Sequence, residues 1–293
     1  MISNGVLKEH KKILNYCGSF RNDDMCLPVK FNLDKQYIPD VRNQGTINSC
    51  VGFAITNIMQ ILNQAETGNR ERFSAGYVYG KCRDENATYR GMYITSALDY
   101  LIKTGSCFER EFPYNEEVPK IMEMVRNRPD LDKKAKPYHI VGYEVYEQSN
   151  KEEKYNHIKM SLYKYNTPIL TSTKWFGGNH AICIIGWNDT TKRFTILNSY
   201  GEDWGEDGIG YVPYGKIDRG YLLLDAKNSE LLMPFKDVSE DEWYYKAVQH
   251  VYNAGLMNGT SANTFEPNKP LTRAEMAQVL VNLCKKFDET KGD

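Results

Sequence analysis

The sequence lacks an excess of charge of one sign. Its 293 residues carry 37 lysines and arginines against 38 aspartates and glutamates, which leaves a formal net charge of -1 at pH 7. No basic stripe interleaved with aromatic residues occurs along the chain. Because binding to a phosphate backbone depends on a local surplus of positive charge, nucleic acid is not expected among the partners.

Long apolar runs are missing as well. Residues 1–24 contain no apolar stretch of signal-peptide length, and no later segment reaches the roughly 18 apolar residues that a membrane-spanning helix needs. We therefore expect neither a signal peptide nor a membrane span in the sequence, and its localisation stays open.

Patterns that bind metals and nucleotides are absent too. The five histidines are scattered, and neither C-x-x-C nor H-E-x-x-H occurs, nor does a glycine-rich phosphate loop follow a predicted strand. We therefore expect no metal site and no cofactor.

The cysteines do not form a disulfide framework, because they are odd in number and widely spaced. Cys183 in a buried-strand pattern and Cys284 in a helical pattern are interpreted as small apolar side chains. Two pairs, Cys17 with Cys26 and Cys82 with Cys107, could form only if the fold brought them together. This usage slightly favours a reducing compartment. The seven are Cys17, Cys26, Cys50, Cys82, Cys107, Cys183 and Cys284.

What the sequence does contain is a reactive-looking segment over residues 44–59, QGTINSCVGFAITNIM. Apolar residues recur there at helical spacing, Ser49 is a predicted N-cap, and Gly68 is a predicted helix end. Cys50 would lie in the first helical turn, where free N–H groups and the helix dipole favour a nucleophilic thiolate. The alternative is a buried structural cysteine on a core helix.

Two later segments supply possible partners for this thiol. His180 opens an apolar run, residues 181–187, that predicts a buried strand, and it follows two glycines that should leave it within reach of a substrate. A second predicted strand, residues 194–197, ends at Asn198. Cysteine catalysis needs a base and a group that orients the base, roles that His180 and Asn198 can fill, although each taken alone is more often structural.

Together these residues resemble the papain-like cysteine peptidases, whose chain order is glutamine, cysteine, histidine and asparagine. Here the order is Gln44, Cys50, His180 and Asn198, with the last two 130 and 148 residues after the cysteine. The resemblance implies that Cys50 forms a covalent acyl-enzyme with a peptide or protein substrate. It further implies that His180 exchanges protons, Asn198 orients it, and the Gln44 amide completes an oxyanion hole.

The resemblance covers roughly residues 27–224 and includes FSAGYVYGKC and FEREFPY. It departs from the family pattern around the nucleophile, which reads INSCV, and after the asparagine, which reads NSY. Ile47 replaces a cysteine that commonly forms a disulfide, and Val51 replaces an aromatic residue. Tyr200 replaces a shielding tryptophan but can still cover the imidazole with an aromatic face. These departures concern efficiency and substrate choice more than chemistry.

The intervening chain predicts an α+β, two-lobed fold. Helices are expected over residues 93–104 and around 155–162, a strand over 138–146, and strands again from 168 onward. The charged runs 120–136 and 147–154 are interpreted as solvated surface. A helical lobe followed by a β-rich lobe places the active site in the cleft between them.

The composition changes near Pro234, and the remaining residues resemble an S-layer homology module through FKDV, Trp243, TFEPN and LTRAE. Two amphipathic helices are expected. The first presents Trp243, Ala247, Val248, Val251 and Tyr252, and the second, capped by Thr272, turns Met276, Val279, Leu280 and Leu283 inward.

The resemblance implies attachment to cell-wall polysaccharide, with Arg273 and Glu275 as candidate glycan contacts and a cell-envelope location if the protein is exported. The alternative is a capping box from Thr272 to Glu275 with Arg273 merely solvated. Because binding usually uses several modules, self-association, as a trimer most simply, is a further expectation.

We thus predict an extension over residues 1–26, a peptidase domain over 27–233 and a module over 234–293. Two functions stay open. One is a thiol peptidase, and the other is a peptidase-like binding protein without turnover.

Overall fold

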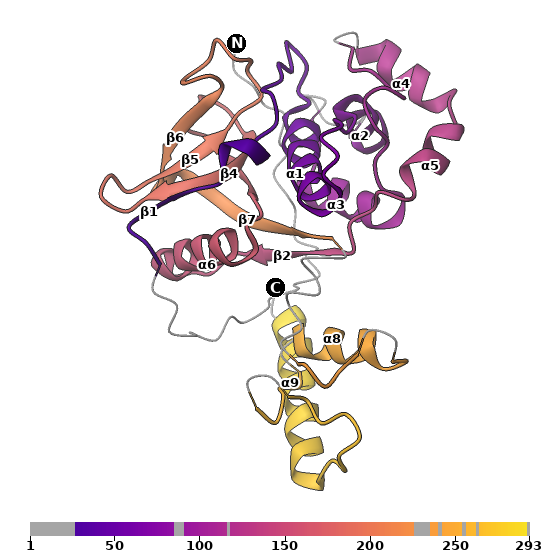
Figure 1. Ribbon diagram of the computed structural model, residues 1–293, viewed down its shortest axis with the longest axis vertical. Helices are drawn as coiled ribbons and strands as arrows, with labels where there is room; N and C mark the ends of the chain where they lie inside the picture. The colour runs from indigo at the N-terminus through magenta and orange to yellow at the C-terminus, as the bar shows by residue number, and fades with distance from the viewer. Residues whose placement is uncertain are drawn as a thin grey trace. The chain divides into compact units, whose positions relative to one another are not determined.

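A computed structural model describes residues 27–84, 91–115, 118–225, 235–239, 242–253, 256–261 and 264–291. The chain divides into two compact units, and the described residues up to 225 belong to the first and those from 235 onward to the second (Figure 1). The predicted extension, with Cys17 and Cys26, lies outside the described residues. None of the helices in these ranges combines the length and apolarity that crossing a membrane requires.

The first unit begins with a lobe of helices. Helix α1, Cys50–Thr67, is buried from Cys50 to Leu62, and it ends as predicted at Gly68, whose φ of 76° is the left-handed value that a helix-ending glycine adopts. The other helices of this lobe are α2 (Ala75–Cys82), α3 (Ile94–Lys103), α4 (Val118–Arg126) and α5 (Asp130–Ala135).

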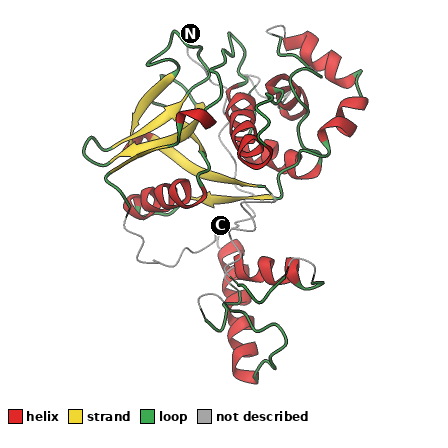
Figure 2. Cartoon of the chain, viewed as in Figure 1, coloured by secondary structure: helices red, strands yellow, loops and turns green. Residues whose placement is uncertain are grey.

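The second lobe is an antiparallel sheet with the strand order β2-β7-β3-β4-β5-β6, and β1 pairs with β4 beside this path. Figure 2 shows the strands gathered in one part of this unit and most of its helices in another. The elements are β1 (Lys30–Asn32), η1 (Lys35–Tyr37), β2 (Gly142–Tyr146), α6 (Lys151–Tyr165), β3 (Ile169–Thr173), β4 (His180–Asn188), β5 (Arg193–Leu197), β6 (Ile209–Pro213), η2 (Tyr214–Lys216) and β7 (Ile217–Leu224).

The two lobes meet where α1 packs on β3 and β4. At this contact the Cys183 thiol of β4 donates a hydrogen bond to the Ala54 carbonyl of α1 across 3.1 Å. Cys183 is buried, as expected, and Cys82 and Cys107 are both free thiols. The predicted α+β architecture is therefore confirmed.

The expectation of solvated surface is correct for residues 147–154, which are mostly exposed, and only partly correct for residues 120–136. Residues 120–136 are not only solvated surface, because they form α4 and α5 and bury an apolar stripe of Ile121, Val125, Leu131 and Ala135. Residues 147–154 run into helix α6. The strand expected over 138–146 is limited to β2, its last five residues.

The second unit contains α8 (Tyr245–Asn253) and α9 (Arg273–Lys291). Its small core is formed by Phe235, Val238 and Val248, against which the partly buried side chains of Tyr244, Tyr245, Tyr252 and Phe265 pack. None of the described residues in this cluster belongs to α9.

The predicted apolar faces of the second unit are therefore only partly correct. Trp243 is 88% exposed and precedes α8, while Met276 and Leu280 on α9 are 48% and 52% exposed. Ala247 is exposed as well, and Val279 and Leu283 are half-buried. Cys284 is exposed on α9, so its interpretation as a small apolar side chain is wrong.

Candidate active site

Cys50 is the first residue of α1 and is fully buried. Its Sγ accepts a hydrogen bond from the backbone N–H of Ala181 across 3.4 Å, which places the thiol beside the first residues of β4. Ser49 occupies the N-cap position, but its hydroxyl makes no cap hydrogen bond. The predicted Ser49 cap is wrong because that hydroxyl bonds with the Tyr114 hydroxyl instead, at 2.8 Å.

His180 and Asn198 are in direct contact. Their strands, β4 and β5, are neighbours in the sheet, and His180 Nε2 lies 2.6 Å from Asn198 Oδ1. The backbone N–H of Ser199 also donates to Asn198 Oδ1, at 2.8 Å, which fixes the orientation of the amide. Because Oδ1 can only accept, Nε2 must carry the proton, and Nδ1 of the neutral ring is left with its lone pair.

The Nδ1 atom of His180 is buried and has no hydrogen-bond partner among the described residues. Burial lowers the pKa of His180 from its ordinary 6.5 to about 4, while the hydrogen bond with Asn198 acts in the opposite direction. A neutral imidazole with an unprotonated Nδ1 is the form that can take a proton from a neighbouring thiol.

Aromatic side chains surround the imidazole. Tyr200 stacks on His180 with ring centroids 4.5 Å apart, as its predicted shielding role requires, and Phe176 meets the imidazole edge-on at 6.0 Å. Trp204 packs edge-on against Phe176 at 5.4 Å. His180 is 0% exposed. The expectation that it is directly reachable by a substrate is therefore wrong for this conformation, because its neighbours cover it.

Gln44 is buried beside Ser199, the residue that follows Asn198. Its backbone N–H donates to the Ser199 carbonyl at 2.9 Å, and its side-chain Oε1 accepts from the Ser199 hydroxyl at 2.6 Å. Its Nε2 donates to the Ile47 carbonyl at 2.8 Å. An amide nitrogen carries two hydrogens, so this contact uses one of them.

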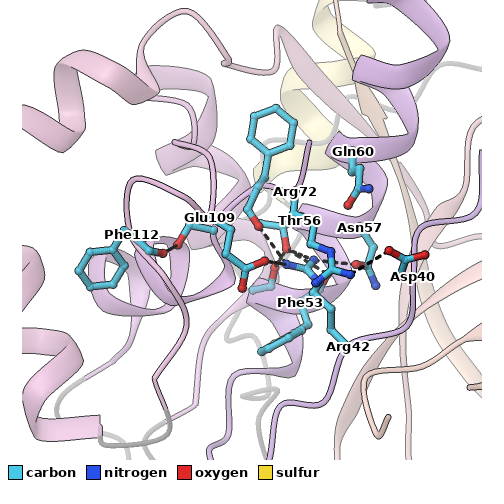
Figure 3. A network of polar contacts seen from close by, with 12 residues as sticks. Asp40, Arg42, Phe53, Thr56, Asn57, Gln60, Arg72, Glu109 and Phe112 are labelled. Carbon is cyan, nitrogen blue, oxygen red and sulfur yellow. Dashed lines mark hydrogen bonds and ion pairs between the residues drawn. The ribbon is translucent and has the colours of Figure 1, made fainter. Parts of the chain in front are cut away.

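Arg42 anchors this segment to the helical lobe, a role that no sequence pattern marked (Figure 3). Its guanidinium donates to Thr56 Oγ1 at 2.7 Å, to Asn57 Oδ1 at 2.6 Å and to the Phe73 carbonyl at 2.9 Å. Burial lowers its pKa to about 10, partly offset by Glu109, which lies 3.7 Å away. Its own carbonyl accepts from the Gly201 N–H at 3.2 Å, so Arg42 links both lobes next to Gln44.

The candidate glycan contacts of the second unit lie apart from these residues in the sequence and are exposed. The Glu275 carboxylate accepts from the Thr272 N–H and hydroxyl, each at 2.7 Å, while the Glu275 N–H donates to the Thr272 hydroxyl at 3.2 Å. This is the predicted capping box. Glu275 is thereby engaged at the start of α9, and Arg273 is exposed beside it.

Within the described residues, no group of three or more histidine, cysteine, aspartate or glutamate side chains is arranged to hold a metal ion.

Comparison with known proteins identifies both parts of the chain. The sequence model of the papain family cysteine proteases matches residues 27–221, and that of the S-layer homology domain matches residues 234–277. The match to the first covers more than half of the sequence. The chain belongs to the papain family of cysteine proteases.

Individual relatives match one or the other of these two parts. A cysteine protease of Blomia tropicalis is 26% identical over 228 residues, which cover 69% of this chain and 64% of that protein. A surface-layer 125 kDa protein of Lysinibacillus sphaericus is 50% identical over 48 residues, 16% of this chain and 4% of that protein. The chain thus spans less than two thirds of the length of either relative.

The fold is shared with solved structures. Xylellain, a cysteine protease from Xylella fastidiosa, superimposes with a TM-score of 0.66 at 21% identity, covering 76% of this chain and 96% of that one. This likeness confirms the papain-like fold.

Proposed function

We propose that the protein is a cysteine peptidase in which Cys50 is the nucleophile and His180 the acid and base. The observation that carries this proposal is the 2.6 Å contact between His180 Nε2 and Asn198 Oδ1, which leaves Nδ1 as the basic atom of the imidazole. The Cys50 thiol lies next to Ala181, the residue that follows His180. Family membership supports the same chemistry.

The reaction follows from these positions. Nδ1 of His180 takes the thiol proton, and the Cys50 thiolate attacks the carbonyl carbon of the peptide bond. The resulting oxyanion is stabilised by the backbone N–H of Cys50 and by Nε2 of Gln44. The imidazolium then protonates the leaving amine, and water, deprotonated by the same imidazole, hydrolyses the thioester. Asn198 keeps the ring in the required tautomer throughout.

The test combines peptide hydrolysis with labelling by a peptide epoxide. Both should be lost in Cys50→Ala, hydrolysis should be lost in His180→Ala, and both should persist in Cys82→Ala, a matched loss of another thiol. Because Cys50 is fully buried, a probe reaches Sγ only when neighbouring atoms move aside, so labelling is followed over time. Full activity in Cys50→Ala or His180→Ala would refute the assignment.

The same experiment separates the peptidase from the alternative function. A folded wild-type protein that hydrolyses no peptide and takes up no epoxide would favour a peptidase-like binding protein without turnover. The presence of all four residues, Gln44, Cys50, His180 and Asn198, favours the enzyme, because the fold itself does not require a thiol at the start of α1.

For the second unit we propose attachment to a cell-surface polymer, as its S-layer homology match and the surface-layer relative suggest. Binding to purified cell-wall polysaccharide would be measured by co-sedimentation. If Arg273 contacts an acidic glycan group, Arg273→Ala should weaken binding, while Lys236→Ala, a loss of another exposed cation in this unit, should not. Equal binding by all three proteins would leave Arg273 with no role beyond solvation.

We further propose that this unit self-associates through the apolar side chains that α9 exposes. Met276, Leu280 and Val281 are about half exposed there, and burying such side chains in an interface is favourable. Analytical ultracentrifugation should show an oligomer for the wild type, most simply a trimer, and a monomer for Leu280→Ser. A monomeric wild type would refute this proposal.

A further inference from the structure

Tyr114, the last residue of the FEREFPY segment, makes two hydrogen bonds through one oxygen. Its hydroxyl donates to the backbone carbonyl of Gln44 at 2.7 Å and lies 2.8 Å from Ser49 Oγ. A tyrosine hydroxyl has one hydrogen, and a carbonyl can only accept. The Tyr114 hydrogen therefore goes to Gln44, and Ser49 donates its own hydrogen to the tyrosine oxygen.

These two contacts lie at the ends of one short loop. The loop begins at Gln44, turns at Gly45, whose φ is 61°, and ends at Ser49, the residue before Cys50. It therefore connects the two groups assigned to the oxyanion, because the Gln44 side-chain amide belongs to its first residue and the Cys50 N–H directly follows its last. Tyr114 is distant in sequence and joins these ends from outside the loop.

The tyrosine ring is itself held in place. It packs edge-on against Phe53 of α1, with centroids 4.7 Å apart and planes at 81°. The position of the hydroxyl is thus tied to the helix that begins with Cys50. The hydrogen bond between the Ser49 and Tyr114 hydroxyls explains why Ser49 does not cap α1. Its hydroxyl is engaged with Tyr114, so the first turn of the helix has no side-chain cap from Ser49.

We propose that Tyr114 is a positioning residue that holds the two oxyanion donors at a fixed separation. The inference rests on the proposed peptidase function and adds a residue that does not touch the reacting atoms. Oxyanion donors act only within a narrow range of distances from the developing charge, so a loop free to widen would lower turnover. Binding of the uncharged substrate depends less on that distance, and alkylation of the thiol forms no oxyanion.

The test is Tyr114→Phe, which removes the hydroxyl and keeps the ring on Phe53. The turnover number for an amide substrate should fall roughly tenfold to a hundredfold with little change in KM. Affinity for a peptide aldehyde, whose thiol adduct places an oxyanion in the same position, should fall by a similar factor. The rate at which iodoacetamide alkylates Cys50 should stay at the wild-type value.

The matched control is Tyr143→Phe, which removes a hydroxyl that donates to Asp99 at 3.1 Å elsewhere in the same unit. Tyr143→Phe should lose about as much thermal stability as Tyr114→Phe, while its turnover number and its affinity for the aldehyde should stay at the wild-type values. Wild-type turnover and aldehyde affinity in Tyr114→Phe would overturn the inference, as would an equal fall in alkylation, which would place its effect on the thiol. A folded wild type without hydrolysis or alkylation at Cys50 would instead overturn the proposed function, and this inference with it.

Discussion

Asn198 accepts a hydrogen bond from His180 Nε2 at 2.6 Å, and the Ser199 N–H holds the same oxygen at 2.8 Å. The asparagine is thus fixed by the backbone before it acts on the imidazole. This relationship determines the tautomer of His180 and so decides which ring nitrogen can serve as a base.

Replacing Asn198 should therefore lower activity without abolishing it. In Asn198→Ala the imidazole keeps its place in β4 but loses the partner that fixes its tautomer, and we expect a loss of about tenfold to a hundredfold in turnover. Steady-state kinetics of Asn198→Ala and Cys50→Ala measured side by side would check this. If the two variants lose the same activity while both stay folded, Asn198 does more than orient the ring.

Replacing Gln44 should affect the transition state more than substrate binding. Gln44→Ala removes one oxyanion donor, and a donor of this kind contributes about 2.7–4 kcal/mol to lowering the barrier. The turnover number should fall accordingly, with KM little changed. The control is Gln64→Ala. It replaces a glutamine of α1 whose Nε2 donates to the Gln36 carbonyl, and its turnover number should stay at the wild-type value. An unchanged turnover number in Gln44→Ala would show that its amide points elsewhere.

The short motifs around Gln44, Cys50, His180 and Asn198 made these residues visible in the sequence, because each lies in a segment of distinctive local pattern. Arg42 lies in no such pattern, and although Tyr114 ends the FEREFPY segment, that pattern does not tell which residues its hydroxyl contacts. Tyr114 meets Gln44 across 70 residues, and Arg42 meets Phe73 across 31, and pairings that long depend on the tertiary fold.

The same reasoning explains the predictions that were wrong. Local pattern placed Ser49 at an N-cap, but a tertiary contact took its hydroxyl. Local pattern also predicted that Met276 and Leu280 of α9 face inward, whereas the small aromatic core of the second unit leaves them exposed. Helical periodicity marks an apolar face and does not tell what covers it.

Arg42 should matter for stability far more than its neighbour Arg72. Arg42→Met would leave Glu109 and the acceptors on Thr56 and Asn57 without their buried cation, which should cost about 3–5 kcal/mol in the free energy of unfolding. Arg72→Met breaks only an exposed 2.9 Å pair with Asp40 and should cost less than about 1 kcal/mol. Chemical denaturation would measure both, and similar losses would contradict the role assigned to Arg42.

Glu144 should make stability depend on pH. This buried carboxylate accepts from the Tyr146 hydroxyl at 2.8 Å, and burial raises its pKa from 4.5 to about 7. Between these values the folded state binds more protons than the unfolded state, so this group's contribution to stability falls as pH rises from about 4.5 to 7 and is constant above.

Glu144→Gln keeps the shape and an acceptor for Tyr146 but cannot ionise. It should exceed the wild type in unfolding free energy at pH 8 by on the order of 3 kcal/mol, with the difference shrinking toward pH 4.5. Denaturation curves across this range would check the sign, with Glu123→Gln, an exposed acid on α4, as the control. A variant less stable than the wild type at pH 8 would show that the charged form is favoured.

The second unit should be dispensable for peptide hydrolysis. It contains none of the four residues assigned to the chemistry, and its core of Phe235, Val238 and Val248 is separate from the packing of α1 against the sheet. A chain ending at Met233 should therefore keep its turnover number while losing any polysaccharide binding or self-association that the full chain shows. Peptide hydrolysis, co-sedimentation and ultracentrifugation of both chains would test this division. The shortened chain could stay folded by circular dichroism and yet hydrolyse no peptide that the full chain cleaves. Residues of the second unit would then contribute to the active site, and the boundary predicted near Pro234 would not separate the two functions.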